Sequence, residues 1–164
     1  MRLYHGGSVV VQNPQPVSPE KNRPLDFGSG FYTTTSLEQA RRWIKIRRGQ
    51  DAAFGRGVIS VFEVDDAELA ASDLKVRRFA LDELDPWFDF VMDNRHTRGF
   101  SHDYDLVIGP VANDNVFATL TLFETGVLSK VQAILQLKTY VLWDQYLFHS
   151  EKALKYLKFI GRQE

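Results

Sequence analysis

Short segments of alternating or continuously apolar residues run through the chain and predict β-strands. The segment 58–64 carries the strongest pattern, and 74–79 alternates apolar with charged residues as a half-buried strand does. The other predicted strands are residues 2–5, 9–11, 31–35, 105–112 and 139–149, the last as one broken strand or a pair. Four prolines between residues 14 and 24 predict a long loop, and loops of that length are often functional.

Apolar residues at helical spacing lie between these strands and predict helices. Two of the helices begin with a Ser-x-x-Gln capping box, Ser36 with Gln39 and Ser129 with Gln132. In such a box the serine hydroxyl accepts a free amide of the first turn, and the glutamine side chain reaches back to the serine amide. The other predicted helices begin at Asp85-Pro86, Asn113 and Ser150, and the last one packs Ala153, Leu154, Leu157 and Ile160 inward.

The order of these elements favours one fold class. The predicted strands do not alternate strictly with the helices, which is typical of α+β proteins. A length of 164 residues suits one domain. Because no repeat, linker or low-complexity segment interrupts the pattern, residues 1–164 are predicted to form a single α+β domain.

Composition narrows the chemistry. The chain has no cysteine, which excludes a thiol nucleophile and a cysteine-ligated metal and fits a reducing compartment. Its 20 Lys and Arg and 21 Asp and Glu give a net charge of −1, which excludes a strongly basic nucleic-acid coat. Histidines and acidic residues lack metal-site spacing, and no segment is apolar enough to span a bilayer. We therefore expect a soluble cytoplasmic protein with no metal and no membrane contact.

Several positions at the ends of predicted strands are candidates for a site, although each alone also fits a structural role. A lone histidine such as His5 is more often structural, and Tyr32 and Trp43 taken singly would be core aromatics. The glycine-rich turn at residues 26–30 is not a phosphate-binding loop, because no Gly-Lys-Ser/Thr follows it. It is not a dinucleotide fingerprint either, because its glycines precede a strand.

Together these positions resemble the ADP-ribosyltransferase superfamily of the His–Tyr–Glu type, which includes diphtheria toxin and the poly(ADP-ribose) polymerases. There an opening strand ends in His-Gly, a Gly-x-Gly-aromatic-Tyr strand follows, and a stacking aromatic lies eleven residues beyond that Tyr. His5-Gly6, residues 28–32 and Trp43 match these elements, with Trp43 eleven residues after Tyr32. Gln145 takes the place of the late-strand glutamate.

Over nearly its whole length the chain also resembles a bacterial family known as domain of unknown function 3990. Members of that family are often encoded beside a small partner gene, which implies a toxin–antitoxin arrangement. The segments that carry this resemblance are residues 3–6, 26–34, 104–111, 144–145, 148–149 and 151–154.

The superfamily resemblance implies a split, mixed β-sheet core flanked by helices, and a site that takes NAD as substrate without a metal. His5, Tyr32 and Gln145 would be the catalytic residues, and Gly30 would belong to the NAD-binding set with His5, Gly6, Tyr32 and Trp43. The rings of Tyr32 and Trp43 would sandwich nicotinamide. The Gly6 backbone would hold the carboxamide, and His5 would hydrogen-bond a ribose hydroxyl.

These assignments predict an NAD-dependent mono-ADP-ribosyltransferase, the toxin of a bacterial pair, which cleaves the nicotinamide–ribose bond. A protein or nucleic acid would accept the ADP-ribose, and a small antitoxin protein would be a partner. Gln145 can hydrogen-bond a ribose hydroxyl but supplies neither a negative charge nor a general base, so chain elongation is not expected. Asp144 and Glu151 are the nearby carboxylates, and the helix dipole already explains Glu151.

Two other interpretations stay open. Gln145 in place of glutamate also suits a non-catalytic NAD- or nucleotide-binding module that acts through protein interaction. The third interpretation is an interaction domain whose aromatic residues all belong to the core.

A cluster of cations on the helix after Tyr32 has two explanations. Arg41, Lys45 and Arg48 share one helical face, and Arg42 and Arg47 add to the charge. A solvated face explains them, and a rim that steers NAD phosphates, an RNA or an acidic partner is the alternative.

Overall fold

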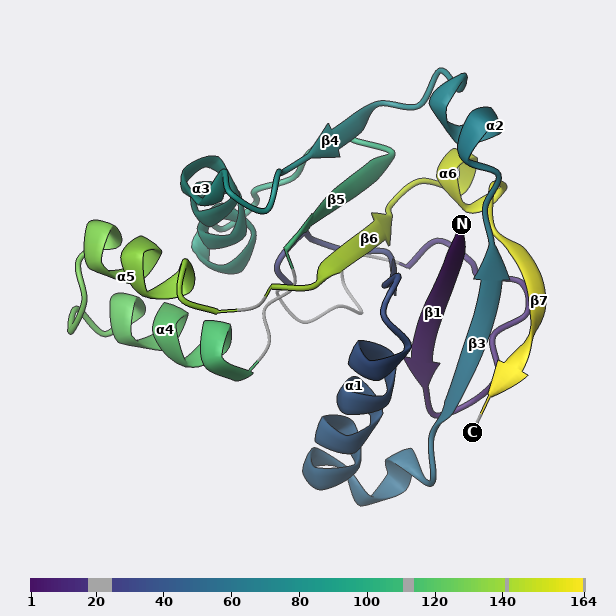
Figure 1. The fold of residues 1–164 in the computed structure, drawn as a ribbon, viewed down its shortest axis with the longest axis horizontal. Helices are drawn as coiled ribbons and strands as arrows, with labels where there is room; N and C mark the ends of the chain where they lie inside the picture. Colours follow the sequence, from purple (N-terminus) through teal and green to yellow (C-terminus); the bar gives the residue numbers. More distant parts are fainter. Residues whose placement is uncertain (18–24, 111–113, 141, 164) are drawn as a thin grey trace.

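The strands of this protein form two sheets in the computed structural model, which describes residues 1–17, 25–110, 114–140 and 142–163 (Figure 1). The first sheet has the order β1-β3-β7 and consists of β1 (Arg2–Gly7), β3 (Val58–Glu63) and β7 (Lys158–Gln163). The second has the order β2-β6-β5-β4 and consists of β2 (Phe31–Thr33), β6 (Asp144–Phe148), β5 (Leu106–Pro110) and β4 (Val76–Arg78). Neighbouring strands are antiparallel, except that β4 and β5 are parallel.

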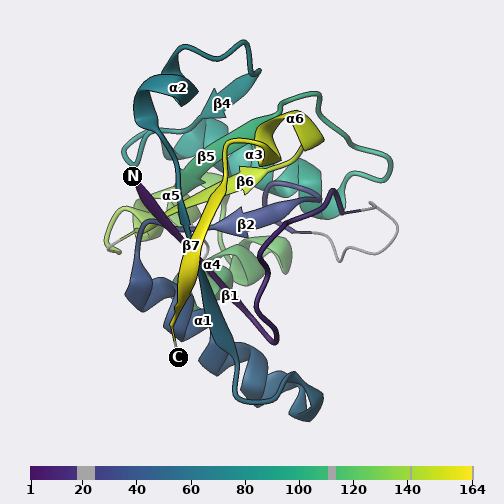
Figure 2. The same ribbon diagram turned by 90° about the vertical axis from the view of Figure 1, so that its right-hand side faces the viewer.

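The two sheets meet where β1 passes β2. Tyr4 N donates to Thr34 O at 2.8 Å, and Thr34 N donates back to Tyr4 O at 3.0 Å. Beyond this bridge the strands diverge, as Figure 2 shows with the first sheet turned toward the viewer. The result is a split, mixed sheet arrangement within one α+β domain, which confirms the predicted class.

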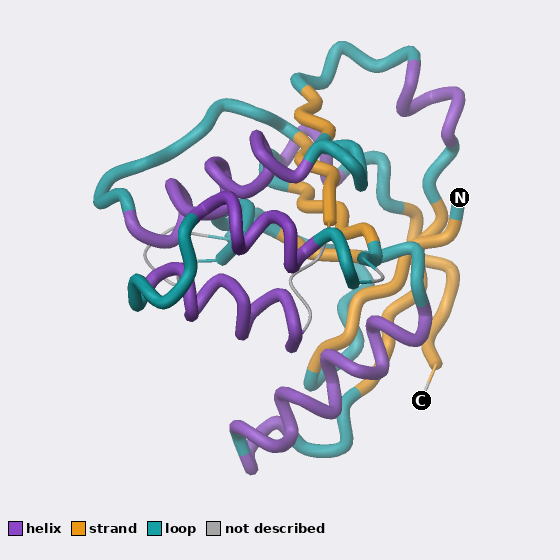
Figure 3. Tube along the Cα trace, turned by 60° about the vertical axis from the view of Figure 1, so that its left-hand side comes forward, coloured by secondary structure: helices purple, strands orange, loops and turns teal. Residues whose placement is uncertain are grey.

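Helices cover the sheets from different sides (Figure 3). Three of them, α3, α4 and α5, lie against one face of the second sheet, and α1 lies against the first sheet. The helices are α1 (Leu37–Gln50), α2 (Asp66–Ala70), α3 (Leu84–His96), α4 (Asp114–Glu124), α5 (Lys130–Leu137) and α6 (Glu151–Leu154), with a 3₁₀ turn at Ala52–Phe54. Among the residues that the structure describes, no helix is both long enough and apolar enough to cross a membrane.

Two large apolar cores form on opposite faces of the second sheet. The helical core joins Leu147 of β6 to Trp87 of α3 and Leu120 of α4. The inter-sheet core joins Phe148 of β6 to Leu3 of β1. Leu147 and Phe148 are consecutive strand residues, so they point to opposite faces. Both side chains are fully buried, which explains why the strand is apolar throughout.

Most predicted elements are present, with narrower bounds. Ser36 caps α1, and the Ser129–Gln132 pair forms a complete capping box at α5. The strand predicted over 139–149 begins only at Asp144. The prediction that Asn113 caps a helix falls outside the described residues.

Three predictions near element ends are wrong. Residues 9–11 form no strand; Val9 is exposed, and Val11 N donates to Ser60 Oγ at 2.9 Å instead of to a neighbouring strand. Asp85 does not cap α3, which begins one residue earlier at Leu84. The Asp85 carboxylate instead pairs with Lys130 of α5 at 3.0 Å.

The third wrong prediction is the long final helix. Helix α6 stops at Leu154, and Lys158–Gln163 form strand β7 along β3. Ile160 is therefore 46% exposed rather than inward-facing, while Phe159 packs on the inter-sheet core. Pairing with β3 satisfies backbone groups that an edge strand would leave unpaired, and this favours the alternating pattern over the helical one.

Candidate functional site

The junction of β1, β2 and α1 brings together most of the residues that the sequence singled out. Tyr4 turns its N–H and C=O toward β2, where both bond to Thr34. Backbone groups of alternate strand residues point to the same side, so the N–H and C=O of Gly6 also point away from β3, toward the side on which β2 lies. Gly6 therefore presents a donor and an acceptor side by side at the point where the sheets part.

Glycine is required at Gly6 because α1 lies directly against it. A Cβ at this position would come within 2.7 Å of Ala40 O and 3.0 Å of Ile44 Cγ1. Gly30 is similarly enclosed: with φ 148°, a Cβ there would lie 2.5 Å from Leu147 Cδ1 and 2.6 Å from Phe148 O. The two glycines allow α1 and β6 to approach the junction closely, which larger residues would prevent.

His5 is a partly buried, neutral histidine at this junction. Its Nδ1 donates to Tyr32 O at 2.8 Å, because a carbonyl can only accept, and its ring stacks on Phe31 at 4.2 Å. Burial lowers the pKa of His5, and the hydrogen bond to Tyr32 opposes that shift. In the neutral form with Nδ1 protonated, Nε2 is an acceptor, and it lies 3.3 Å from where a Cβ of Gly7 would be.

Tyr32 anchors the glycine-rich turn before β2. Its hydroxyl donates to Gly28 O at 2.6 Å and accepts from Phe27 N at 3.1 Å. Burial, and after it the charge of Asp26, raise the pKa of the Tyr32 phenol well above its usual range. The phenol therefore stays protonated and serves as a fixed donor to the turn.

Two histidines complete a clamp on the same turn, which we call the turn clamp: Tyr32, His102 and His149. His102 Nε2 donates to Phe27 O at 2.8 Å, and His149 Nδ1 donates to Ser29 O at 2.6 Å. The two imidazole rings lie 4.6 Å apart. Three consecutive carbonyls, 27 to 29, are thus each held by a side chain, which fixes the approach to β2.

An ion pair supports the turn from α3. Arg95 binds Asp26 at 3.2 Å and Glu124 of α4 at 3.2 Å, with all three side chains largely buried. Arg95 also lies over the Phe117 ring at 5.1 Å. Its role in the structure is therefore to tie α3 and α4 to the turn.

Gln145 is buried in β6 with a weak partner. Its Nε2 lies 3.5 Å from Pro110 O, a carbonyl that already accepts from Trp87 Nε1 at 3.0 Å. Asp144, beside it, accepts from Thr35 N at 3.2 Å and Thr35 Oγ1 at 2.7 Å. The carboxylate is thus committed to the loop before α1, whereas the Gln145 amide is only loosely held.

Trp43 lies on α1 and is 44% exposed, so its ring is available to a ligand. Of the cations on the same helix, Arg42 lies over the Trp143 ring at 5.9 Å and Arg47 over Phe54 at 5.8 Å. Arg41, Lys45 and Arg48 are solvent-exposed. Glu151 is also exposed, at the start of α6.

The structure distributes the predicted catalytic side chains over two faces of the second sheet. Tyr32 pairs with Leu147 and packs on the helical core, and Gln145 faces the same side as Leu147, two residues away. The His5 ring instead stacks on Phe31, which belongs to the inter-sheet core. His5 approaches Tyr32 through the Tyr32 backbone rather than through its ring.

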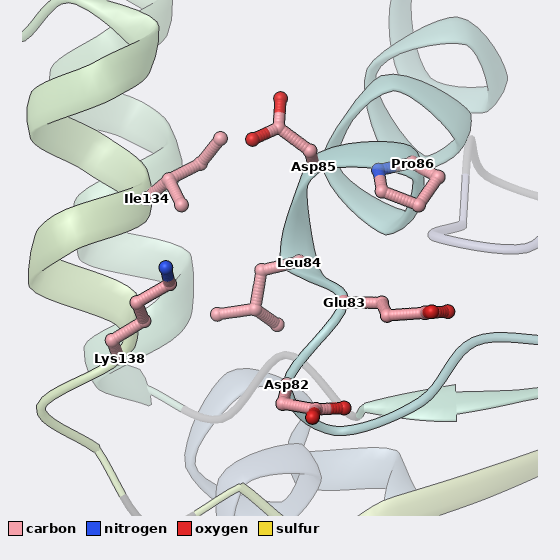
Figure 4. Close-up of a pocket in the computed structure, with 7 residues that line it drawn as sticks. All are labelled: Asp82, Glu83, Leu84, Asp85, Pro86, Ile134 and Lys138. Carbon is pink, nitrogen blue, oxygen red and sulfur yellow. The ribbon is translucent and has the colours of Figure 1, made fainter.

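Two hollows on the surface lie away from this junction. One, of about 340 Å³, opens between the start of α3 and α5 (Figure 4). Leu84 and Ile134 form its apolar floor, with Asp82, Asp85 and Lys138 around them. The other, of about 460 Å³, lies beside Met1 and Lys158. In the described part of the chain, no group of three or more His, Asp and Glu is placed to hold a metal ion.

Two features of the site were missed by the sequence analysis. The turn clamp was missed because His102 and His149 are far from residues 27–29 in sequence and carry no motif for that contact. Gln39, predicted to complete a capping box, instead has a buried side-chain oxygen without a hydrogen-bond partner. The Ser-x-x-Gln spacing is visible in the sequence, but it does not indicate whether the Gln39 side chain accepts from the Ser36 amide.

The protein is a single α+β domain with two small sheets. The sheets separate at the junction of β1 and β2, and α1 packs closely there because Gly6 has no side chain. The chain belongs to the family described as "Protein of unknown function (DUF3990)", whose model matches residues 1–159. No curated protein matches it, and no solved structure does. The family resemblance found in the sequence is confirmed, and the relation to ADP-ribosyltransferases stays a prediction.

Proposed function

We propose that this protein is an NAD-dependent mono-ADP-ribosyltransferase that binds NAD at the junction of β1, β2 and α1. The observation that supports the proposal is Gly6, whose adjacent N–H and C=O point away from β3, on the side where β2 pairs with Tyr4. A carboxamide has one acceptor and two donors, so it can bond to both groups at once. Trp43, exposed on the helix that packs against Gly6, supplies a ring on which nicotinamide can stack.

The chemistry requires a rigid site more than a strong base. Cleaving the nicotinamide–ribose bond creates a positively charged, oxocarbenium-like ribose and a neutral leaving group. Holding nicotinamide and orienting the ribose hydroxyls therefore lowers the barrier. His5 Nε2, an acceptor in the neutral ring, would bind one ribose hydroxyl. The loosely held Gln145 amide lies on the other face of the second sheet, near the start of β6, and would bind another hydroxyl only after leaving Pro110 O.

Gln145 limits the reaction to a single transfer. An amide carries no charge and cannot take a proton from water or from a growing chain. The acceptor must therefore bring its own nucleophile, either a protein side chain or a nucleic-acid group. The exposed cations Arg41, Lys45 and Arg48 lie on the face of α1 away from Trp43, where they would attract the NAD pyrophosphate or an anionic acceptor to this helix.

A specific observation favours a second candidate, a binding module without catalysis. Gln145 is buried and its nearest partner is a backbone carbonyl of the core. In this alternative Gln145 has only a packing role, and NAD binds through Gly6 and Trp43 without being cleaved.

Release of nicotinamide from NAD, with a cell lysate as the source of acceptors, separates the two candidates. The parent protein, Gln145→Ala and Gln145→Glu are compared side by side. An orienting amide predicts that Gln145→Ala lowers release by about 10²–10³-fold. Gln145→Glu retains release and increases NAD hydrolysis, because a carboxylate stabilises the cation and activates water. If neither the parent protein nor Gln145→Ala releases nicotinamide while both still bind NAD, the result supports the binding module.

The proposed toxin role has its own test. The family resemblance implies a small antitoxin partner, so expression of the parent chain alone should slow the growth of a bacterial host. His5→Ala should relieve this effect at equal soluble yield. Normal growth with abundant parent protein argues against a toxin.

A further inference from the structure

Two Ser-x-x-Gln segments start helices in this chain, but only one closes its capping box. At α5, Gln132 N donates to Ser129 Oγ at 3.2 Å, and Ser129 N donates to Gln132 Oε1 at 2.9 Å. At α1, Gln39 N donates to Ser36 Oγ at 3.2 Å in the same way. The second bond of the box is missing, because Ser36 N donates to Thr34 Oγ1 at 3.1 Å rather than to Gln39 Oε1.

The open box leaves Gln39 Oε1 without a donor. The Gln39 side chain is 8% exposed, and its oxygen is fully buried without a hydrogen-bond partner. Thr34 Oγ1 in turn donates to Asp144 O at 2.8 Å, so the start of α1 is tied to the start of β6. A buried acceptor without a donor destabilises the free protein, and such groups usually have a reason to persist.

The position of Gln39 on α1 indicates what that reason is. Gln39 and Trp43 are four residues apart and share one flank of the helix. Ala40, on one side of that flank, packs on Gly6, and Arg42, on the other, covers Trp143. The helical turn of about 100° per residue places the Gln39 side chain between these two contacts, next to the junction.

We propose that Gln39 Oε1 accepts a hydrogen bond from a ribose hydroxyl of a bound nicotinamide nucleotide. This inference rests on the proposed function, since it takes NAD as the ligand. Gly6 already offers both groups that a carboxamide needs, and Trp43 offers the stacking ring. The ribose hydroxyls lie next to a stacked nicotinamide and can donate hydrogen bonds. Gln39 Oε1 is the unpaired acceptor on the flank of α1 that also carries Trp43.

The test compares Gln39→Met with the matched variant Gln132→Met at the closed box. Calorimetry measures the affinity for NAD and for free nicotinamide, and thermal unfolding measures the Tm of each ligand-free protein. For Gln39→Met we expect NAD binding to weaken about 10-fold, with nicotinamide binding unchanged because the free base has no ribose. Its Tm should rise by about 2–4 °C, since an unpaired buried oxygen is removed. Gln132→Met should lower the Tm and leave NAD affinity unchanged.

Each contrary result has a distinct meaning. Unchanged NAD affinity in Gln39→Met overturns the role of Gln39 but not the proposed function. Equal loss of NAD and nicotinamide affinity overturns the ribose assignment and places Gln39 on the carboxamide. Failure of the parent to bind NAD overturns both proposals. A lower Tm for Gln39→Met shows that the oxygen is paired in the folded protein, which also overturns the inference.

Discussion

At the scale of single residues, the Tyr32 hydroxyl has a structural role that is distinct from the stacking role proposed for its ring. A stacking role uses the ring, whereas the structure shows the hydroxyl bound to Gly28 O and Phe27 N. The hydroxyl thus shapes the turn that leads into β2, and the ring packs against the helical core. Because the two roles use different atoms, one substitution can remove the hydroxyl and keep the ring.

Tyr32→Phe should destabilise the protein without a comparable loss of NAD affinity. The substitution leaves a buried carbonyl and a buried amide unpaired, which costs about 1–3 kcal/mol in the free energy of unfolding. The retained ring keeps any stacking on nicotinamide. Urea unfolding and calorimetry with NAD measure the two effects, and Tyr32→Ala, which removes ring and hydroxyl, should lower both. An unchanged unfolding free energy in Tyr32→Phe would show that the turn does not depend on the hydroxyl.

At the scale of elements, the contact between α1 and β1 sets the geometry of the junction. Ala40 and Ile44 of α1 contact the space that a Gly6 side chain would fill. Trp43 and Gln39 lie on the same helix, so their distance from β1 follows from this contact. Any residue larger than glycine at position 6 must displace the backbone of α1 at Ala40.

Gly6→Ala should therefore lower both stability and NAD affinity. A Cβ 2.7 Å from Ala40 O meets backbone rather than a flexible side chain, and overpacking of this kind costs about 1–3 kcal/mol. Gly49→Ala in the same helix is the matched control, because a Cβ there has nothing within 4 Å. That control should raise stability by about 0.5–1 kcal/mol and leave NAD binding unchanged. If Gly6→Ala binds NAD like the parent, the carboxamide is not held at Gly6.

At the scale of the whole molecule, partly buried neutral histidines connect distant parts of the chain and make its stability depend on pH. Burial is the main cause that lowers the pKa of His5 and of His102; for His102 the neighbouring His149 adds to it. His5 joins β1 to β2, and His102 joins the segment after α3 to the glycine-rich turn. Protonating either ring in the folded protein is therefore unfavourable, because it places a charge in a poorly solvated position, although the hydrogen bonds to Tyr32 O and Phe27 O oppose this effect.

Stability should fall as the pH drops below about 6.5. The histidines of the unfolded chain take up protons near their ordinary pKa of 6.5, whereas the pKa values of the folded His5 and His102 are lower. The unfolded state then binds more protons, so the free energy of unfolding decreases from pH 6.5 down to the folded pKa values and is fully retained above pH 6.5. Urea midpoints at pH 7.5 and 5.5 measure the change, and His102→Asn should reduce its size. Identical midpoints at both pH values would contradict the direction of these shifts.

Local patterns in the sequence determined much of this protein. The apolar, β-branched run along residues 58–64, the caps at Ser36 and Ser129, and the glycine-rich turn before Phe31 are visible in the local sequence, and the structure has these elements in place. The motif positions His5-Gly6 and Trp43 were visible for the same reason. The family membership follows from residues spread over nearly the whole chain.

Only the tertiary structure decided which of two local patterns prevailed and which polar groups found partners. Lys158–Gln163 became a strand because β3, about a hundred residues earlier, offers it unpaired backbone groups. The Ser36 box stayed open because Thr34, held by Asp144 from β6, takes the Ser36 amide first. Identical Ser-x-x-Gln spacings thus end in different hydrogen bonds, since a contact more than a hundred residues away competes with the local one.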